Sequence, residues 1–220
     1  RNMTIASRWY SSFVLDRDFA EEEKDFKANL EFLKKVGASR INVSEQSGSI
    51  QGKTDVPILT GNHKRVTNEE EWKRMNDGLN KLGKIAKDNG FKLCFHHHMG
   101  TVIQTLEETE KMLANTDPEY VYLCFDTGHF TFAGEDPLTM LKKYKDRIGH
   151  VHLKDMRLDV VKQVSENNWS FLQAVRNGAF TVPGDGGVDF DPIFAVLDEA
   201  NYEGWLLVEA EQDPAKANPL

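Results

Sequence analysis

Short runs of β-branched and aromatic residues alternate along the chain with longer stretches in which hydrophobic positions recur every three or four residues. The short runs predict strands, and the longer spacing predicts amphipathic helices. We expect strands at residues 3–7, 40–44, 91–95, 120–125, 148–153 and 205–208. We expect helices between them, one ending at Gly37, one from Thr67 to Asn89, and others at 105–113, 137–144 and 192–200.

The signals at the helix ends agree with this alternation. Gly37 is a typical helix stop, and Thr67 with Glu70 has the spacing of a capping box. Strands that alternate with helices form right-handed βαβ units and a parallel sheet. The pattern alone leaves open whether that sheet is wound flat or closed into a barrel.

Composition narrows the class of protein. The 220 residues include 27 basic and 35 acidic side chains, a net charge of −8, and 40% of the residues are hydrophobic. A cationic surface for nucleic acid or for an anionic membrane is therefore not expected. No apolar run is long enough to span a membrane, and Cys94 and Cys124 cannot form a disulfide scaffold. We expect a cytoplasmic protein without a nucleic-acid or membrane partner.

Polar side chains gather where the predicted strands end. Six of the seven histidines, all except His63, lie at these ends together with acidic residues. The residues concerned are Glu45, Gln46, His96, His97, His98, Asp126, His129, His150, His152, Lys154, Glu209 and Glu211. The carboxyl ends of parallel strands share one face of the sheet, where sites are built. Imidazoles mixed with carboxylates favour a transition metal such as manganese, cobalt or zinc over calcium.

Any one of these histidines, taken singly, reads as a polar loop residue, so the prediction depends on their recurrence across four strands. Side chains alternate along a strand, so His97 should point away from His96 and His98 and pack among helices. Cys94 and Cys124 each precede a candidate ligand by two residues. We expect them to be buried thiols in equivalent layers of neighbouring strands.

Three motifs make a family resemblance recognisable: Asp-x-x-His at 126–129, HVHLKD at 150–155 and GDGGVDF at 184–190. With these motifs the chain resembles the xylose-isomerase-like TIM-barrel superfamily of sugar isomerases, epimerases and endonuclease IV. More narrowly it resembles the inosose dehydratase family of myo-inositol catabolism. The matching stretches are SEQSGSIQG (44–52), HHHMGT (96–101), FDTGHFTFAG (125–134), FTVPGDG (180–186) and VEAEQDPAKANPL (208–220).

The resemblance implies an α/β fold, a TIM (β/α)8 barrel, with residues 1–220 forming a single partial domain. A barrel of this kind has eight βα units in about 250 residues, whereas the pattern predicts six strands. The expectation is therefore a barrel that lacks its first two βα units and its last helix. The first and last strands should then have unpaired edges.

The resemblance also implies a divalent metal, most readily manganese or cobalt, held by a Glu, an Asp, a His and a Glu from four successive strand ends. Carried over by position, these are His96, Asp126, His152 and Glu209, and His96 departs from the family pattern. Glutathione is a further cofactor that the family suggests. The sequence leaves the oligomeric state open and is compatible with a homo-oligomer.

The implied reaction removes water from 2-keto-myo-inositol, a small polyol ketone, to give a trihydroxycyclohexanedione by metal-assisted enolisation and β-elimination. His98 is the candidate base, and Lys154 would stabilise the enolate or donate a proton. The alternative for Lys154 is a surface pair with Asp155. The residues expected to hold the polyol are Trp9, Glu45, Gln46, His129 and Glu211.

Two other classes of function stay open at this point. One is a metal-dependent sugar isomerase or epimerase on the same barrel, which must return a proton to carbon. The other is a sugar- or metal-binding protein that has lost catalysis. An abasic-site nuclease is disfavoured by the net charge of −8.

Overall fold

Six parallel strands form the central sheet of the computed structural model, which describes residues 3–213 and 215. Their order across the sheet is β1-β2-β3-β4-β5-β8. The bounds are β1 Trp9–Ser12, β2 Arg40–Glu45, β3 Lys92–His96, β4 Val121–Asp126, β5 Ile148–Leu153 and β8 Leu206–Val208. Every neighbouring pair is parallel, as the alternation of strands and helices predicted.

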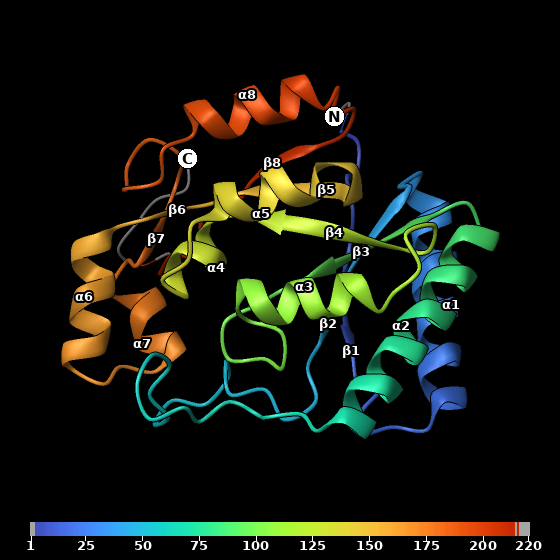
Figure 1. The fold of residues 1–220 in the computed structure, drawn as a ribbon, viewed down its shortest axis with the longest axis horizontal. Coiled ribbons are helices and arrows are strands. Elements are labelled where there is room, and N and C mark those ends of the chain that lie inside the picture. The colour runs from blue at the N-terminus through green and yellow to red at the C-terminus, as the bar shows by residue number, and fades with distance from the viewer. Residues whose placement is uncertain (1–2, 214, 216–220) are drawn as a thin grey trace.

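The helices follow the strands in chain order. They are α1 Phe19–Val36, α2 Glu69–Asp88, α3 Leu106–Ala114, α4 Thr127–Phe132, α5 Pro137–Tyr144, α6 Leu158–Glu166, α7 Phe171–Arg176 and α8 Asp191–Glu199, with a 3-10 turn at Lys145–Arg147. In Figure 1, α1 and α2 lie at one end of the molecule and α6 and α7 at the other, with the strands between them. Among the described residues, no helix has both the length and the apolar content that a membrane span requires.

The two faces of the sheet differ in chemistry because side chains alternate along each strand. One face is apolar and packs in the main hydrophobic core with residues from the helices. The apolar positions include Ile41, Val43, Leu93, Phe95, Leu123, Phe125 and Val151. The other face carries the polar positions Asn42, Ser44, Cys94, His96, Cys124, Asp126, His150 and His152, all of them buried. The candidate site lies on this polar face.

The first strand is displaced from its predicted place at residues 3–7 to Trp9–Ser12. Met3 and Ile5 are 76% and 43% exposed, so the run that predicted a strand packs against little. The true strand pairs with β2 from Trp9 to Ser12. Trp9 and Ser11 fall on the polar face, opposite Asn42 and Ser44. The sequence Trp-Tyr-Ser-Ser has no alternation of hydrophobic and polar residues, so the pattern could not detect this strand.

The predicted stop of α1 at Gly37 is confirmed. Gly37 has φ 73°, and its N–H donates to the carbonyls of Leu33 and Lys34. The capping box predicted for α2 is wrong by one residue: Asn68 and Glu71 form it, and Thr67 and Glu70 do not. Both pairs have the same spacing, and Asn is at least as good an N-cap as Thr, so spacing alone could not separate them.

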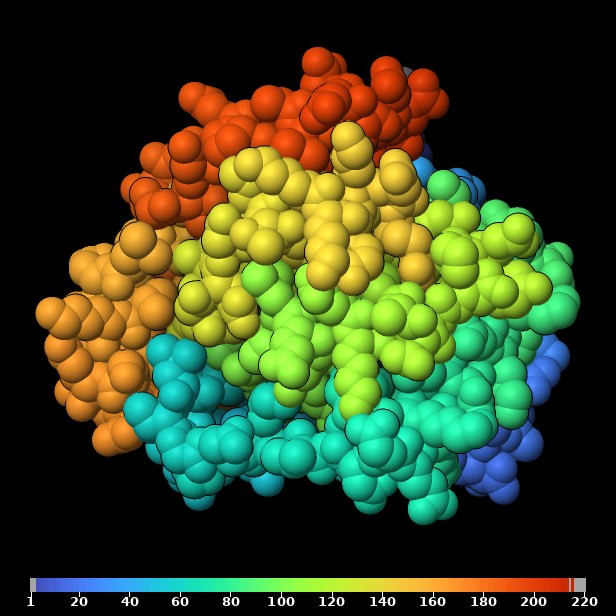
Figure 2. Space-filling view, in the orientation of Figure 1, coloured from blue at the N-terminus to red at the C-terminus, as the bar shows by residue number. Residues whose placement is uncertain are grey.

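Residues 155–181 build a separate layer beside the sheet. They contain α6, α7 and the antiparallel pair β6 (Asp155–Met156) and β7 (Phe180–Thr181). A second hydrophobic cluster joins this layer to the loop after β2, in which Ile58 N–H donates to the carbonyl of Trp169. Figure 2 shows that loop (cyan) lying against the α6–α7 segment (orange). The layer therefore closes one side of the polar face.

Candidate metal centre

Four side chains from four neighbouring strands meet at the carboxyl edge of the sheet. His96 ends β3, Asp126 ends β4, His152 lies near the end of β5, and Glu209 follows β8. Each offers one ligand atom, and these atoms all lie within 4.8 Å of one another. Asp126 Oδ2 is 3.3 Å from His96 Nε2 and 3.5 Å from His152 Nδ1, and His152 Nδ1 is 2.8 Å from Glu209 Oε2. The structure thus brings together the four residues predicted as ligands.

The local sequence explains how Asp126 is presented. It is both the last residue of β4 and the N-cap of α4, and its Oδ1 accepts a hydrogen bond from the backbone N–H of His129 at 2.8 Å. The Asp-x-x-His spacing is therefore the spacing of a helix N-cap. With Oδ1 engaged by the helix, Oδ2 is the oxygen that faces the histidines.

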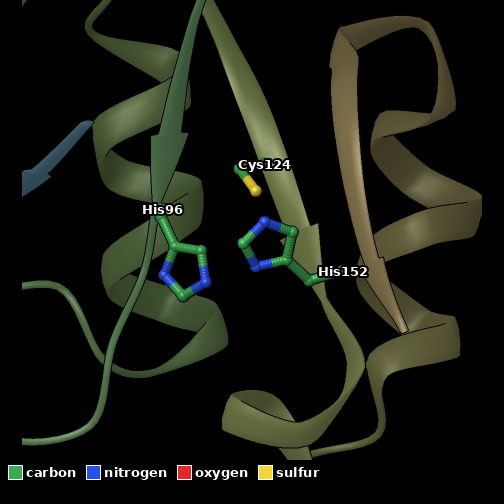
Figure 3. Close-up of side chains that lie close together, drawn as sticks. All are labelled: His96, Cys124 and His152. Atoms are coloured by element: carbon green, nitrogen blue, oxygen red, sulfur yellow. The ribbon is translucent and has the colours of Figure 1, made fainter. Parts of the chain in front are cut away.

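The donor set fits a divalent transition metal. Two imidazoles and two carboxylates are the ligands that such ions take. His152 Nδ1 and Glu209 Oε2 are buried and close together, yet neither has hydrogen-bond geometry with any described residue. Figure 3 shows the rings of His96 and His152 side by side; their centroids are 5.0 Å apart, and the strands that carry them, β3 and β5, flank β4.

The electrostatics of the cluster favour a positive charge. Burial alone would raise the pKa of Asp126, but Lys154 and the histidines hold it well below its usual range. Burial likewise opposes ionisation of Glu209, yet His152 and Lys154 lower its pKa to about 2. Without a bound cation, burial opposes protonation of His152 while Cys124, Asp126 and Glu209 raise its pKa; a cation bound at Nδ1 would take the place of that proton. Both carboxylates are ionised at neutral pH and attract a cation.

Lys154 lies buried beside this cluster, and its side chain is 1% exposed. Its Nζ is 2.8 Å from Glu211 Oε1, 3.3 Å from Glu209 Oε2 and 3.6 Å from Asp126 Oδ2. These carboxylates raise the pKa of Lys154 against the effect of burial, so the side chain stays an ammonium.

The alternative of a surface pair with Asp155 is wrong. Asp155 is buried, and its carboxylate accepts from four backbone N–H groups, those of Met156, Gly184, Gly186 and Val188. It holds the glycine-rich loop after β7 against β6. Lys154 therefore does not pair with Asp155, and its ammonium contacts the carboxylates of the polar cluster.

His98 has a defined tautomer. Its Nδ1 is 2.8 Å from the carbonyl of Met99, so Nδ1 carries the proton and Nε2 keeps its lone pair. Burial lowers the pKa of His98 to about 4, which keeps the ring neutral at pH 7. His98 groups with His129 and Glu211, whose ligand atoms also lie within 4.8 Å of one another.

Residues 7–219 match the protein family described as Xylose isomerase-like TIM barrel. A protein of Clostridium beijerinckii named inosose dehydratase is 57% identical over 220 residues, which cover the whole of this chain and 73% of its relative. Its namesake from Clostridium perfringens is 58% identical over the same shares of both chains. The chain belongs to the inosose dehydratase family.

Solved structures agree on the fold. The probable 3-DHS dehydratase AsbF of Bacillus anthracis superposes with a TM-score of 0.73 at 16% identity, over 97% of this chain and 72% of that one. The IolI protein, solved with a zinc atom, superposes with a TM-score of 0.69 at 19% identity, over 95% of this chain and 68% of that one. The predicted α/β barrel class is confirmed.

The residues predicted to hold substrate fall into two groups. Trp9 and His129 line the polar cluster: the Trp9 ring lies 5.1 Å from that of His96, and His129 Nε2 lies 3.2 Å from Lys154 Nζ. Glu211 joins them through its contact with Lys154. The roles of these residues stay predictions.

Glu45 and Gln46 are engaged by the chain itself. Glu45 accepts hydrogen bonds from the Ser12 hydroxyl and from the N–H groups of Val14 and Ser47, all at 3.1 Å. The side-chain amide of Gln46 donates to the Ser44 hydroxyl and accepts from Gln51. Their contacts give no support to a role in holding substrate.

Two expectations about packing have different outcomes. His97 is buried and stacks on Phe130 with centroids 3.5 Å apart, so its predicted packing away from the site is confirmed.

Cys94 and Cys124 are buried free thiols, but the prediction that they occupy equivalent layers is wrong. The register pairs Cys124 with His96, and Cys94 lies one layer deeper opposite Tyr122. In Figure 3 the sulfur of Cys124 lies beside the His152 ring.

Sequence reasoning missed Asn42, whose side-chain Nδ2 lies 3.1 Å from His152 Nε2. The signal was present in the strand at 40–44. Asn42 stands between the buried apolar residues Ile41 and Val43. Because side chains alternate along a strand, Asn42 points to the opposite face of the sheet. A polar residue there belongs to the same face as the candidate ligands.

Proposed function

We propose that this chain dehydrates 2-keto-myo-inositol, taking a proton from the carbon next to the ketone and releasing the β-hydroxyl as water. Membership of the inosose dehydratase family supports the substrate. The observation that carries the chemistry is the neutral His98 beside His96 and His129, with the buried ammonium of Lys154 in contact with His129.

We propose that His96, Asp126, His152 and Glu209 hold one divalent ion, with manganese or cobalt as the native metal. When bound, such an ion polarises the substrate carbonyl and stabilises the enolate that forms beside it. The ionised carboxylates of Asp126 and Glu209 supply the negative charge that retains it.

His98 is the proposed base. A base must be unprotonated at the working pH, and burial with the Nδ1 contact to Met99 leaves the Nε2 lone pair of His98 free to take a proton. A positioned general base contributes roughly 10²–10⁴-fold to the rate.

Lys154 is the proposed acid. Glu211 and Glu209 both contact its ammonium, so the position of the ammonium does not depend on a bound substrate. It donates a proton to the departing β-hydroxyl and offsets negative charge on the substrate. Trp9, which is 38% exposed and makes edge contacts with the rings of His96 and His98, offers an aromatic face for the polyol ring.

The test compares His98→Ala with His97→Gln, a matched control from the same run of histidines that packs on Phe130. His98→Ala should lower kcat by roughly 10²–10⁴-fold while elemental analysis finds unchanged metal content. His97→Gln should leave kcat near that of the wild type. Loss of metal from His98→Ala would make His98 a ligand and refute its assignment as base.

The product separates dehydration from the other reactions of this barrel. The dione formed from inosose is followed by absorbance, with and without added glutathione, which we propose as a stimulating cofactor. Release of an isomeric ketone instead of the dione would contradict the proposed function and favour an isomerase or epimerase.

A further inference from the structure

Asn42 is a buried amide that faces the His152 side of the cluster. It lies on β2, is 3% exposed, and points from the polar face of the sheet. Its Nδ2 is 3.1 Å from His152 Nε2 and 3.1 Å from the Ser7 hydroxyl, while its Oδ1 has no partner among the described residues.

The geometry of His152 fixes which ring nitrogen can bind an ion. Nδ1 faces the carboxylates of Asp126 and Glu209, and Nε2 faces Asn42. A neutral imidazole has one lone pair and one N–H. If Nδ1 supplies the lone pair to an ion, Nε2 must carry the proton and needs an acceptor.

The amide of Asn42 can be that acceptor after a half-turn of its terminal group, because the oxygen and nitrogen of an amide occupy nearly equivalent positions. The turn places Oδ1 beside His152 Nε2 and the Ser7 hydroxyl. It leaves one amide atom without a partner, as the present orientation does. The tautomer of His152 therefore decides which orientation is adopted.

The neighbouring groups accept the same arrangement. The Ser7 hydroxyl lies 3.3 Å from His150 Nε2 and can donate to the Asn42 oxygen while it accepts from His150. A continuous chain of donors and acceptors then runs from His150 through Ser7 and Asn42 to His152. Each hydrogen bond in the chain has a defined direction.

We propose that Asn42 is a positioning residue for the metal site: its side-chain oxygen accepts from His152 Nε2–H and thereby directs the Nδ1 lone pair toward Asp126 and Glu209. The inference rests on the metal site of the proposed function. Partners of this kind typically change metal affinity about 10–100-fold when removed.

Cys124 is the competing acceptor, because its sulfur also lies against the His152 ring (Figure 3). Cys124 is a buried free cysteine. A thiol sulfur is a weak acceptor, whereas an amide oxygen is a strong one. Asn42 is the better partner for His152.

The experiment measures the affinity of the full chain for Mn²⁺ by competition with a chelator. Asn42→Leu removes the acceptor at nearly constant volume, and Asn42→Asp restores an oxygen. The matched control is Asn76→Leu, because Asn76 on α2 is also buried with an unpartnered Oδ1 but does not contact the cluster. Circular dichroism and thermal unfolding follow the fold of each variant.

Asn42→Leu should bind Mn²⁺ about 10–100-fold more weakly than the wild type, and Asn42→Asp should recover that affinity. Asn76→Leu should change stability alone. Wild-type affinity in Asn42→Leu, or equal weakness in the Leu and Asp variants, would overturn the inference. A loss of affinity in Cys124→Ala that Asn42→Leu lacks would assign the contact to Cys124.

If Asn42→Leu does not fold, the comparison of Asn42→Asp with Asn42→Ser decides, because only Asp keeps an oxygen at the same reach. Wild-type protein that binds no Mn²⁺ would refute the proposed metal site itself. Normal metal binding and turnover in the wild type, with no effect at Asn42, would refute only the positioning role.

Discussion

Glu45 is a buried acid at the end of β2 whose ionisation should make the protein less stable as pH rises. Its side chain is fully enclosed, and burial raises its pKa from 4.5 to about 7 despite the hydrogen bonds from Ser47 and Ser12. Glu45→Gln keeps the shape of the side chain and removes the titration. The difference in unfolding free energy between wild type and variant then isolates this group.

The direction of this pH dependence follows from proton binding. The folded state holds the proton of Glu45 more tightly than the unfolded chain does, so its contribution to stability is fully present below about pH 4.5. That contribution is lost as pH rises through the folded-state pKa near 7. Because one pKa unit corresponds to about 1.4 kcal/mol, the whole loss is about 3 kcal/mol.

Urea unfolding of both proteins across this pH range measures the effect. We expect the wild type to lose about 3 kcal/mol relative to Glu45→Gln between pH 4.5 and pH 8. Glu71→Gln is the control: Arg65 lowers the pKa of Glu71, so its carboxylate is ionised throughout the upper part of the range. A constant difference between wild type and Glu45→Gln would refute the reasoning. A raised KM for inosose in Glu45→Gln would instead favour the substrate-binding role that the sequence predicted for Glu45.

Two further changes probe the ammonium of Lys154. Lys154→Met should lower kcat by roughly 10²-fold or more and should tighten Mn²⁺ binding, because it removes a positive charge 3.3 Å from Glu209 and 3.6 Å from Asp126; weaker Mn²⁺ binding would contradict this. Gly128→Ala should lower kcat with metal content retained, because an added Cβ would lie 2.6 Å from Lys154 Cγ and displace that side chain. Wild-type kinetics in Gly128→Ala would show that catalysis does not require Lys154 to be held in this position.

The sequence predicted the gathering of the site because strand parity and topology carry that information. His96 and His98 share a parity that excludes His97, and parallel strands bring Asp126 and Glu209 to one edge. These relations depend only on the period of a strand and on the direction of its neighbours. The packing of His97 on Phe130 and the meeting of the four predicted ligands both follow from them.

Other features depend on register and tertiary contacts that no local pattern contains. The two cysteines differ in level because of how β3 and β4 pair, and the β4–β5 ladder has a register shift between Leu123 and Cys124. The sequence neighbours of Lys154 left open whether it lies in the site or pairs with Asp155 at the surface. Its burial comes from Phe180, whose ring lies 4.8 Å from Nζ, and from Glu211, far along the chain.

The central claim is that His96, Asp126, His152 and Glu209 hold one divalent cation on which dehydration depends. The most direct test titrates chelator-treated protein with Mn²⁺ while turnover of inosose to the dione is recorded at each point, beside His152→Ala. We predict that turnover rises with bound metal to a limit at one equivalent, and that His152→Ala neither binds the metal nor gains turnover. Full turnover by metal-free protein, or stoichiometric binding and turnover in His152→Ala, would contradict it.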